Sequence, residues 1–356
     1  MPPFMDRVAT LVTQTHRKTR YPQAQRESRT LRHCGEMTGT GDAVLLARLA
    51  AAQGGVVLTA QALAGGWKRG RLNRRFRAEG WTQLRAGVWV EPGRGVDPMA
   101  LLWANQLAHA RLVVSHTAAA VLHDIETRAP RVEFTGPPKG RTDVHGGVLH
   151  RLPLGADETT TLGGLRGTTV VRTMADLLRA GPRDDALVAV ESAVSGRPSR
   201  YGGGERRRAP LTTLGEIARA LERGSAMRGT ATAREWLALA DPKAGSPAET
   251  IARLRMHDAG LHPASQVLLT TPMGRRAYPD FFFRAQGLVV EIEGYRWHGS
   301  RAQHQRDIAR FNDLMSCGEV RRILRFTASD VYRRPGAMIR DIRGALAQLS
   351  GVQPAS

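Results

Sequence analysis

The chain has 356 residues, 42% of them hydrophobic, which is enough for two or three domains with cores of their own. Its 52 Lys and Arg residues outnumber 32 Asp and Glu residues, so the formal net charge is +20. Such a surface attracts phosphate backbones first and anionic membranes second. Two cysteines, Cys34 and Cys317, exclude a disulfide framework and a cysteine-based zinc site, and they favour a reducing compartment.

The sequence carries no targeting or membrane signal that we can identify. An uninterrupted apolar segment of the signal-peptide kind is missing near the N-terminus, and no run reaches the roughly 18 apolar residues of a membrane span. We therefore expect a cytoplasmic protein whose partner is DNA and which does not attach to a membrane. Its oligomeric state is left open.

Changes in composition divide the chain into five expected segments, which together predict a multidomain protein of the α+β and α/β classes. The first is polar, rich in Thr, Gln and Arg, and without a sustained period, which predicts a disordered basic leader in which Met37 is an alternative initiator to Met1. The segments are a leader at 1–41, a winged helix-turn-helix at 42–97, an α+β regulator-type domain at 98–194, a linker with helices at 195–245, and a nuclease-like domain at 246–350.

The segment 42–97 has the order of a winged helix-turn-helix. Three helices are predicted, the third from Trp67 to Trp81, and two short strands flank the turn at Ala86 and Gly87. In such a module the third helix enters the major groove and the hairpin lies along the backbone. A run of arginines is often only a solvated face, but helix count, turn glycines and net charge agree here on DNA contact. The predicted DNA-binding residues are Arg69, Arg71, Arg74, Arg75, Arg77 and Arg85.

The segment 98–194 mixes helical and strand-like stretches. Helices are expected in PMALLWANQLAHA, SHTAAAVLHDI and TMADLLRAG, and strands in RVEFTGP and GGVLHRLPL. His116 and His123 are seven residues apart on one helix face, but no third ligand stands at a metal-binding spacing. We interpret both as packing or surface histidines.

The last segment predicts a small mixed sheet flanked by helices, in the order helix, three strands, helix, strand, helix. Ser246 is the expected N-cap of the first helix, and Glu249 completes a capping box. Carboxylates then interrupt strand-like stretches. Strand alternation places Glu291 and Glu293 on one face, and a hairpin through RAQG brings Asp280 to the same neighbourhood.

Carboxylates beside a core need a compensating cation, and a divalent metal ion is the obvious one. Oxygen ligands without cysteine favour Mg²⁺ or Mn²⁺ over zinc, and such an ion supports phosphodiester hydrolysis. His298 is a candidate general base. No lysine follows Lys243, so any role that a lysine would fill in this segment must pass to His298, Arg296 or Glu293. The structural alternative pairs Glu291 and Glu293 with Arg275, Arg276 or Arg296.

Four features of the last segment form one pattern: a helical Glu, an Asp followed by E-x-E-G-x-x-W-H, the stretch R-x-x-D-x-x-R-x-N-x-L, and the strand ILRFT. Over about residues 246–345 this pattern resembles the very-short-patch-repair (Vsr)-like endonuclease domains of the PD-(D/E)XK superfamily. The resemblance implies a restriction-endonuclease-like fold and Mg²⁺- or Mn²⁺-dependent cutting or nicking of DNA, in repair or defence.

The same resemblance implies roles residue by residue. Asp280 and Glu291 become metal ligands, and Glu293 stands where the superfamily has lysine. His298 becomes an active-site histidine, and Glu249 a ligand or a carboxylate that supports the ligands. Asp307, Arg310 and Asn312 match the helix pattern. A glutamate at the lysine position leaves open a weakened or lost activity.

About residues 42–190 are similar to the AbiEi-like antitoxin regulators, in which a winged helix precedes a domain with a motif like SHTAAAVLHDI. This similarity implies an alternative function, a transcriptional regulator or antitoxin of the type IV toxin–antitoxin kind with an inactive nuclease-like domain. An endonuclease would depend on Asp280, whereas a regulator would depend on Arg71, Arg74 and Arg75.

Overall fold

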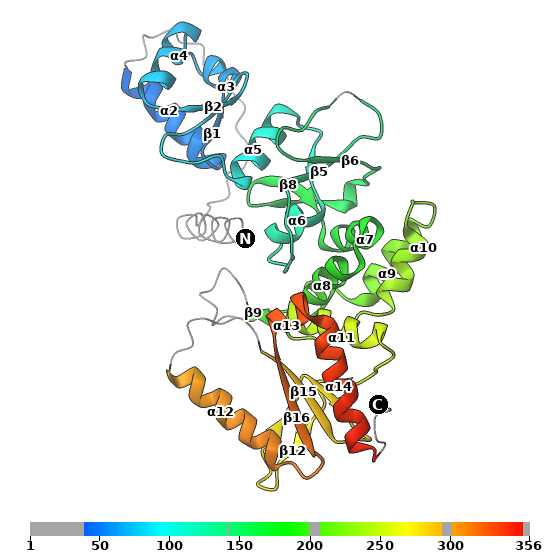
Figure 1. Cartoon of the computed structure of the whole chain (residues 1–356). Coiled ribbons are helices and arrows are strands. Elements are labelled where there is room, and N and C mark those ends of the chain that lie inside the picture. Colours follow the sequence, from blue (N-terminus) through cyan, green and yellow to red (C-terminus); the bar gives the residue numbers. More distant parts are fainter. Residues whose placement is uncertain (1–38, 141, 199–206, 294–300, 352–356) are drawn as a thin grey trace. The chain divides into compact units, whose positions relative to one another are not determined.

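A computed structural model describes residues 39–140, 142–198, 207–293 and 301–351 of the chain (Figure 1). These residues form a mixed α/β structure with several sheets. Contacts group the chain into two compact units: unit 1 holds the chain up to Asp124 with Ala129–Thr173 and Pro198–Arg206, and unit 2 holds Ile125–Arg128, Met174–Arg197 and the chain from Arg207 onward. None of the described helices combines the length and apolar character that a membrane crossing requires.

The first part of unit 1 contains three helices and a three-stranded antiparallel sheet in the order β1-β3-β2. The expected hairpin is present, with Gly87 in the left-handed region at its turn. Strand β1 was not predicted, and α2 starts at Gly39, inside the stretch expected to be a disordered leader. Residues 1–38, with Met37, lie outside the described residues. The elements are α2 (Gly39–Ala52), β1 (Val56–Leu58), α3 (Thr59–Ala64), α4 (Arg69–Ala78), β2 (Thr82–Arg85) and β3 (Val88–Val90).

The rest of unit 1 is built on a five-stranded mixed sheet in the order β6-β5-β4-β8-β7. Its core contains Leu112, Phe134 and Leu165. As expected, the two histidines serve packing: His116 stacks on His150, and His123 Nε2 lies 2.8 Å from the carbonyl oxygen of Thr168. The elements are α5 (Pro98–Ala108), β4 (Val113–Val114), α6 (His116–Leu122), β5 (Glu133–Gly136), β6 (Val148–Arg151), the short 3-10 turn η1 (Ala156–Glu158), β7 (Thr159–Leu162) and β8 (Leu165–Thr168).

After the short stretch Ile125–Arg128, unit 2 resumes at Met174 within α7 (Val170–Ala180), whose first residues belong to unit 1. It continues with α8 (Arg183–Val194), a helix that was not predicted, because almost every residue of it is buried and no polar face marks its period. Thr213 caps the predicted helix that follows. The further elements here are β9 (Arg197–Pro198), β10 (Arg207–Arg208), α9 (Leu214–Arg223) and α10 (Thr230–Leu237).

The last part of unit 2 contains a four-stranded sheet in the order β11-β14-β15-β16, mixed as predicted because β15 and β16 are parallel and the other pairs antiparallel. The strand expected in SQVLLT was wrong: it is two short strands, and β12 pairs with β13 in a separate hairpin. The elements are α11 (Pro247–Asp258), β11 (Ala264–Ser265), β12 (Leu269–Thr270), β13 (Arg276–Ala277), β14 (Phe281–Phe283), β15 (Leu288–Glu293), α12 (Arg301–Ser316), β16 (Arg322–Thr327), α13 (Ala328–Arg333) and α14 (Pro335–Leu349).

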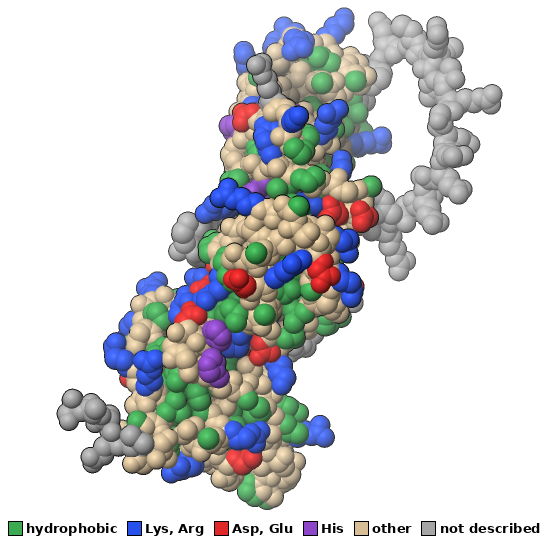
Figure 2. All heavy atoms as spheres, turned by 90° about the vertical axis from the view of Figure 1, so that its right-hand side faces the viewer, with side chains coloured by type: hydrophobic (Ala, Val, Ile, Leu, Met, Phe, Trp, Pro, Cys, Tyr) green, Lys and Arg blue, Asp and Glu red, His purple; other side chains and the backbone are tan. Residues whose placement is uncertain are grey.

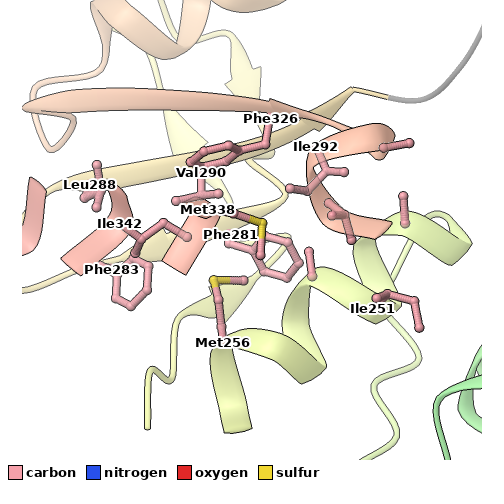
Figure 3. Close-up of a cluster of buried hydrophobic side chains, with 14 of the residues drawn as sticks. Ile251, Met256, Phe281, Phe283, Leu288, Val290, Ile292, Phe326, Met338 and Ile342 are labelled. Atoms are coloured by element: carbon pink, nitrogen blue, oxygen red, sulfur yellow. The ribbon is translucent and has the colours of Figure 1, made fainter. Parts of the chain in front are cut away.

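Both faces of this sheet are covered, because alternate strand residues enter two different cores. Phe281, Val290 and Ile292 pack with residues of α11 and α14 (Figure 3). Phe282 and Val289 pack on the opposite side with Leu314 of α12. Figure 1 shows α12 and α14 flanking β15 and β16. By the same alternation, Glu291 belongs to the α12 side of the sheet, next to a core.

Candidate functional site

Three carboxylates converge at one end of this sheet, and each comes from a different element. Asp280 immediately precedes β14, Glu291 lies in β15, and Glu249 lies in the first turn of α11. The backbone N–H of Asp280 donates to Glu291 Oε1 at 3.0 Å, and Asp280 Oδ2 accepts from the N–H of Ile292 at 2.8 Å. The predicted β14–β15 hairpin therefore brings Asp280 and Glu291 together, as expected.

Glu249 is held by the start of α11. Ser246 caps this helix as predicted, its hydroxyl accepting from the N–H of Glu249 at 3.2 Å. The second half of the capping box was wrong: Glu249 Oε2 accepts from the N–H of Gly245 at 2.7 Å and not from that of Ser246. This carboxylate is thereby fixed at the N-terminus of α11, where the helix dipole favours negative charge.

Gln266 links the carboxylates. Its Nε2 donates to Asp280 Oδ1 at 3.1 Å and lies 3.4 Å from Glu249 Oε2. Gln266 has a φ of 48°, in the left-handed region that side chains other than Gly, Asn and Asp rarely adopt. Such strain is typical of residues that a site holds in a required position. Gln266 was not predicted, and no local sequence signal distinguishes it.

Burial makes these acids weak. Burial, and after it the charge of Asp280, raises the pKa of Glu249 to about 7. The same two causes raise the pKa of Glu291 to about 7. Burial also raises the pKa of Asp280, which is 5% exposed. Carboxylates gathered away from water favour their neutral forms unless a cation joins them.

Arg310, from α12, supplies positive charge to the cluster. Its Nη2 lies 3.3 Å from Asp280 Oδ1 and 3.1 Å from Glu291 Oε2. The same nitrogen donates to the carbonyl oxygen of Tyr278 at 3.0 Å. The Arg310 side chain remains 48% exposed. Its only sequence signal was its place in the helix pattern of the Vsr-like resemblance.

A cleft of about 530 Å³ opens beside the cluster. Exposed Arg276 and Tyr278 lie on the wall formed by β13 and the segment after it, while Arg310 and Asp313 come from α12. The cleft therefore presents cationic and aromatic side chains next to buried carboxylates. The lining residues are Glu249, Gln266, Arg276, Ala277, Tyr278, Asp280, Ala309, Arg310 and Asp313.

The structure does not bring Glu293 into the cluster. Its side chain is 44% exposed, and Glu293 Oε1 pairs with Arg325 Nη2 of β16 at 2.5 Å. Glu291 and Glu293 share a strand face, yet only Glu291 contacts Asp280 and Arg310. His298 and Arg296, predicted for this site, lie outside the described residues.

The ion pairs that were offered as a structural alternative have other partners. Glu291 pairs with Arg310 and Glu293 with Arg325, whereas Arg275 pairs with Asp313 at 2.5 Å. The assignment of Arg275 or Arg276 to these glutamates was therefore wrong. The positive charges come from Arg310 of α12 and Arg325 of β16, which are distant in sequence from the glutamates. The local order of residues does not indicate such pairs.

The oxygens that meet in the cluster are of the kind that a hard divalent cation prefers, since they belong to the carboxylates of Asp280 and Glu291 and to the main chain of Tyr278. Across residues 39–140, 142–198, 207–293 and 301–351, however, no three His, Cys, Asp or Glu side chains are arranged to hold a metal ion together. The Arg310 guanidinium meets the same oxygens that such an ion would use. A metal would therefore require movement of Arg310.

The predicted DNA-binding arginines lie in unit 1. Arg69, Arg74 and Arg77 of α4 are exposed, and so is Arg71, which also lies over the ring of Trp67. Arg75 pairs with Glu79 at 2.6 Å and is therefore partly neutralised. Arg85 lies in β2 and is half-buried. On the face in Figure 2, Lys and Arg side chains are spread widely, with acidic side chains between them.

No protein-family model matches the chain. Two curated proteins from two strains of Mycobacterium tuberculosis, both described as uncharacterized, are each 35% identical to it over 124 residues. The match covers 35% of this chain and 45% of each relative, so the chain spans less than half the length of these relatives. Activity and partners must therefore be argued from the residues of the site.

Proposed function

We propose that this protein is a DNA-binding, metal-dependent endonuclease or nickase whose active site lies at the Asp280–Glu291–Glu249 cluster. The observation that carries the proposal is the convergence of three carboxylates beside an open cleft: buried Glu249 and Asp280 line the cleft, and half-buried Glu291 accepts from the backbone N–H of Asp280. The raised pKa values of Glu249 and Glu291 show that the fold keeps acidic groups where burial opposes their charge. Carboxyl groups with raised pKa values beside a cleft are a recognised mark of a candidate functional site.

In this proposal Asp280 and Glu291 hold a Mg²⁺ or Mn²⁺ ion, and Glu249 supports or joins them. The ion would polarise a substrate phosphate and activate water for phosphodiester hydrolysis. Gln266 orients Asp280 and Glu249 through its side-chain amide. Arg276, at the cleft wall, is placed to bind a backbone phosphate, and Tyr278 offers an exposed ring against which a base can stack.

The same proposal makes the start of unit 1 a winged helix-turn-helix that binds DNA. Helices α2, α3 and α4 followed by the β2–β3 hairpin support it, as do the exposed arginines of α4. Phosphate contacts by these arginines would give affinity without sequence preference. The winged helix would then supply DNA binding, and the carboxylate cluster would supply the cut.

Cleavage of supercoiled plasmid DNA tests this function. The full chain with Mn²⁺ or Mg²⁺ is expected to nick or linearise the plasmid, whereas the Asp280→Asn variant is expected to bind DNA equally well and leave it intact. Asp313→Asn is the matched control, because Asp313 lines the same cleft but pairs with Arg275. DNA binding without any metal-dependent cleavage by the parent chain would rule out the proposal.

A specific observation supports a second candidate function, a transcriptional regulator or antitoxin with an inactive nuclease-like domain. Arg310 already pairs with Asp280 and Glu291, and Glu293 is turned to Arg325. In that case operator binding would depend on Arg71 and Arg74 and would be indifferent to Asp280→Asn. Selective retention of one promoter fragment from a genomic library, with no metal-dependent cleavage, is the result that this function predicts.

A further inference from the structure

Arg310 is placed as an internal counter-cation of the carboxylate cluster. A single nitrogen, Nη2, contacts oxygens of Asp280, Glu291 and Tyr278 at 3.0–3.3 Å. These oxygens come from β15 and from the segment before β14, whereas Arg310 comes from α12 on the covering layer. The contact is therefore tertiary, and it joins the helix to the site.

A guanidinium and a divalent cation cannot share these oxygens. At such short separations two positive charges repel by several kcal/mol even when the effective dielectric constant is about 20. Arg310 can leave without disturbing a core, because its side chain is half exposed and lines the open cleft. Among the described side chains of α12, Leu314, one turn farther along the helix, belongs to a hydrophobic core.

We propose that Arg310 occupies the cation position in the metal-free protein, is displaced into the cleft when a divalent metal binds, and there contacts the substrate phosphate. This inference rests on the proposed function. No lysine follows Lys243 in this chain, so arginine is the residue type that can bring a permanent positive charge to a phosphate here. A guanidinium keeps its charge and matches two phosphate oxygens at once.

The displacement is tested by calorimetric titration of Mn²⁺ into the full chain without DNA. Arg310→Met is expected to bind Mn²⁺ at least about tenfold more tightly than the parent, because the competing charge is gone. Arg276→Met is the matched control: it removes a charge from the same cleft, but Arg276 makes no ion pair with the cluster among the described residues. Its affinity should change by less than about threefold.

Thermal unfolding gives a second measurement. Without metal, Arg310→Met should unfold at a lower temperature than the parent, because buried carboxylates lose their partner. Mn²⁺ should then raise its unfolding temperature by more than it raises that of the parent. If Arg310→Met does not fold, Arg310→Gln removes the charge while keeping hydrogen-bond donors, and it must show the same order of Mn²⁺ affinities.

The phosphate contact is tested by cleavage at saturating Mn²⁺. Arg310→Met should cut DNA at least about tenfold more slowly than the parent although it binds the metal more tightly. Faster cutting by Arg310→Met would mean that Arg310 only blocks the metal site, and it would overturn the phosphate contact. Mn²⁺ affinity that is unchanged in Arg310→Met, or raised equally in Arg276→Met, would overturn the displacement alone. If neither the parent nor Arg310→Met binds Mn²⁺, both the displacement of Arg310 and the proposed metal-dependent function are wrong.

Discussion

Glu291 and Glu293 stand two residues apart on one strand face, yet they have different surroundings. Glu291 is 12% exposed and pairs with Arg310, whereas Glu293 is 44% exposed and pairs with Arg325. Glu293 is the last residue of β15, whereas Glu291 lies two residues inside the strand. Depth along the strand, more than strand alternation, decides which carboxylate belongs to the site.

Substitution of each glutamate by glutamine checks this distinction. Glu291→Gln is expected to slow metal-dependent cleavage at least about 100-fold, because it removes a ligand charge. Glu293→Gln is expected to change the rate by less than about threefold, because an exposed ion pair contributes little. Single-turnover cleavage rates measure both. Equal losses in the two variants would return Glu293 to the active site.

The carboxyl of Glu249 makes stability depend on pH. Its pKa is raised from 4.5 to about 7, so the folded state binds this proton more tightly than the unfolded state does. The stabilisation by that proton is present at low pH and is lost as pH rises from about 4.5 to 7. Urea unfolding measured across this pH range should show that the free energy of unfolding falls less steeply with rising pH in Glu249→Gln than in the parent. An equally steep fall of the free energy of unfolding in Glu249→Gln would contradict this role of Glu249.

At the scale of elements, the local sequence pattern predicted a helix or strand correctly where one face of the segment is polar or where turn-forming residues mark its end. It predicted the β14–β15 hairpin, the start of α11 at Ser246 and the turn at Gly87. It failed for α8, because every residue of this helix from Ala186 to Val194 is buried and the stretch therefore has no amphipathic period. It also failed for the separate β12–β13 hairpin, because strands of two residues are too short to show alternation.

The same distinction holds for the candidate site: residues joined by a local hairpin were predicted, and residues that reach it by tertiary packing were not. Asp280 and Glu291 were found because one hairpin joins them and a strand period orients them. Arg310 and Gln266 reach the cluster only through the packing of α12 and through the strained backbone at Gln266. Contacts between residues distant in sequence are set by tertiary packing, and a single sequence does not contain them in readable form.

The cap of α11 links an element to the site. Ser246→Ala should destabilise the protein by about 1 kcal/mol, because the first turn loses an acceptor for the N–H of Glu249. Thr213→Ala, which removes the cap of α9, should cost a similar amount. Only Ser246→Ala should also weaken Mn²⁺ binding, since Glu249 lies in the turn that it caps. Chemical denaturation and calorimetric titration of both variants measure these effects, and equal Mn²⁺ affinities would separate the cap from the site.

At the scale of the whole molecule, the net charge of +20 raises the question whether DNA binding is diffuse or localised. Acidic and basic side chains are interspersed on the face in Figure 2, so charge alone does not define a binding surface. The exposed arginines of α4 differ from other arginines by their density on one short helix. A localised surface and a diffuse one respond differently to the same loss of charge.

The salt dependence of DNA binding distinguishes these cases. Replacing Arg69, Arg71, Arg74 and Arg77 by Gln should lower the slope of log affinity against log salt by about 1 to 4, since each phosphate contact contributes roughly 0.9. The control variant replaces four exposed arginines of unit 2 by Gln, namely Arg219, Arg223, Arg228 and Arg234. Because both variants lose the same charge, only a binding surface on α4 makes their slopes differ. Equal slopes would mean that DNA is bound by the overall charge, and α4 would then have no special role in recognition.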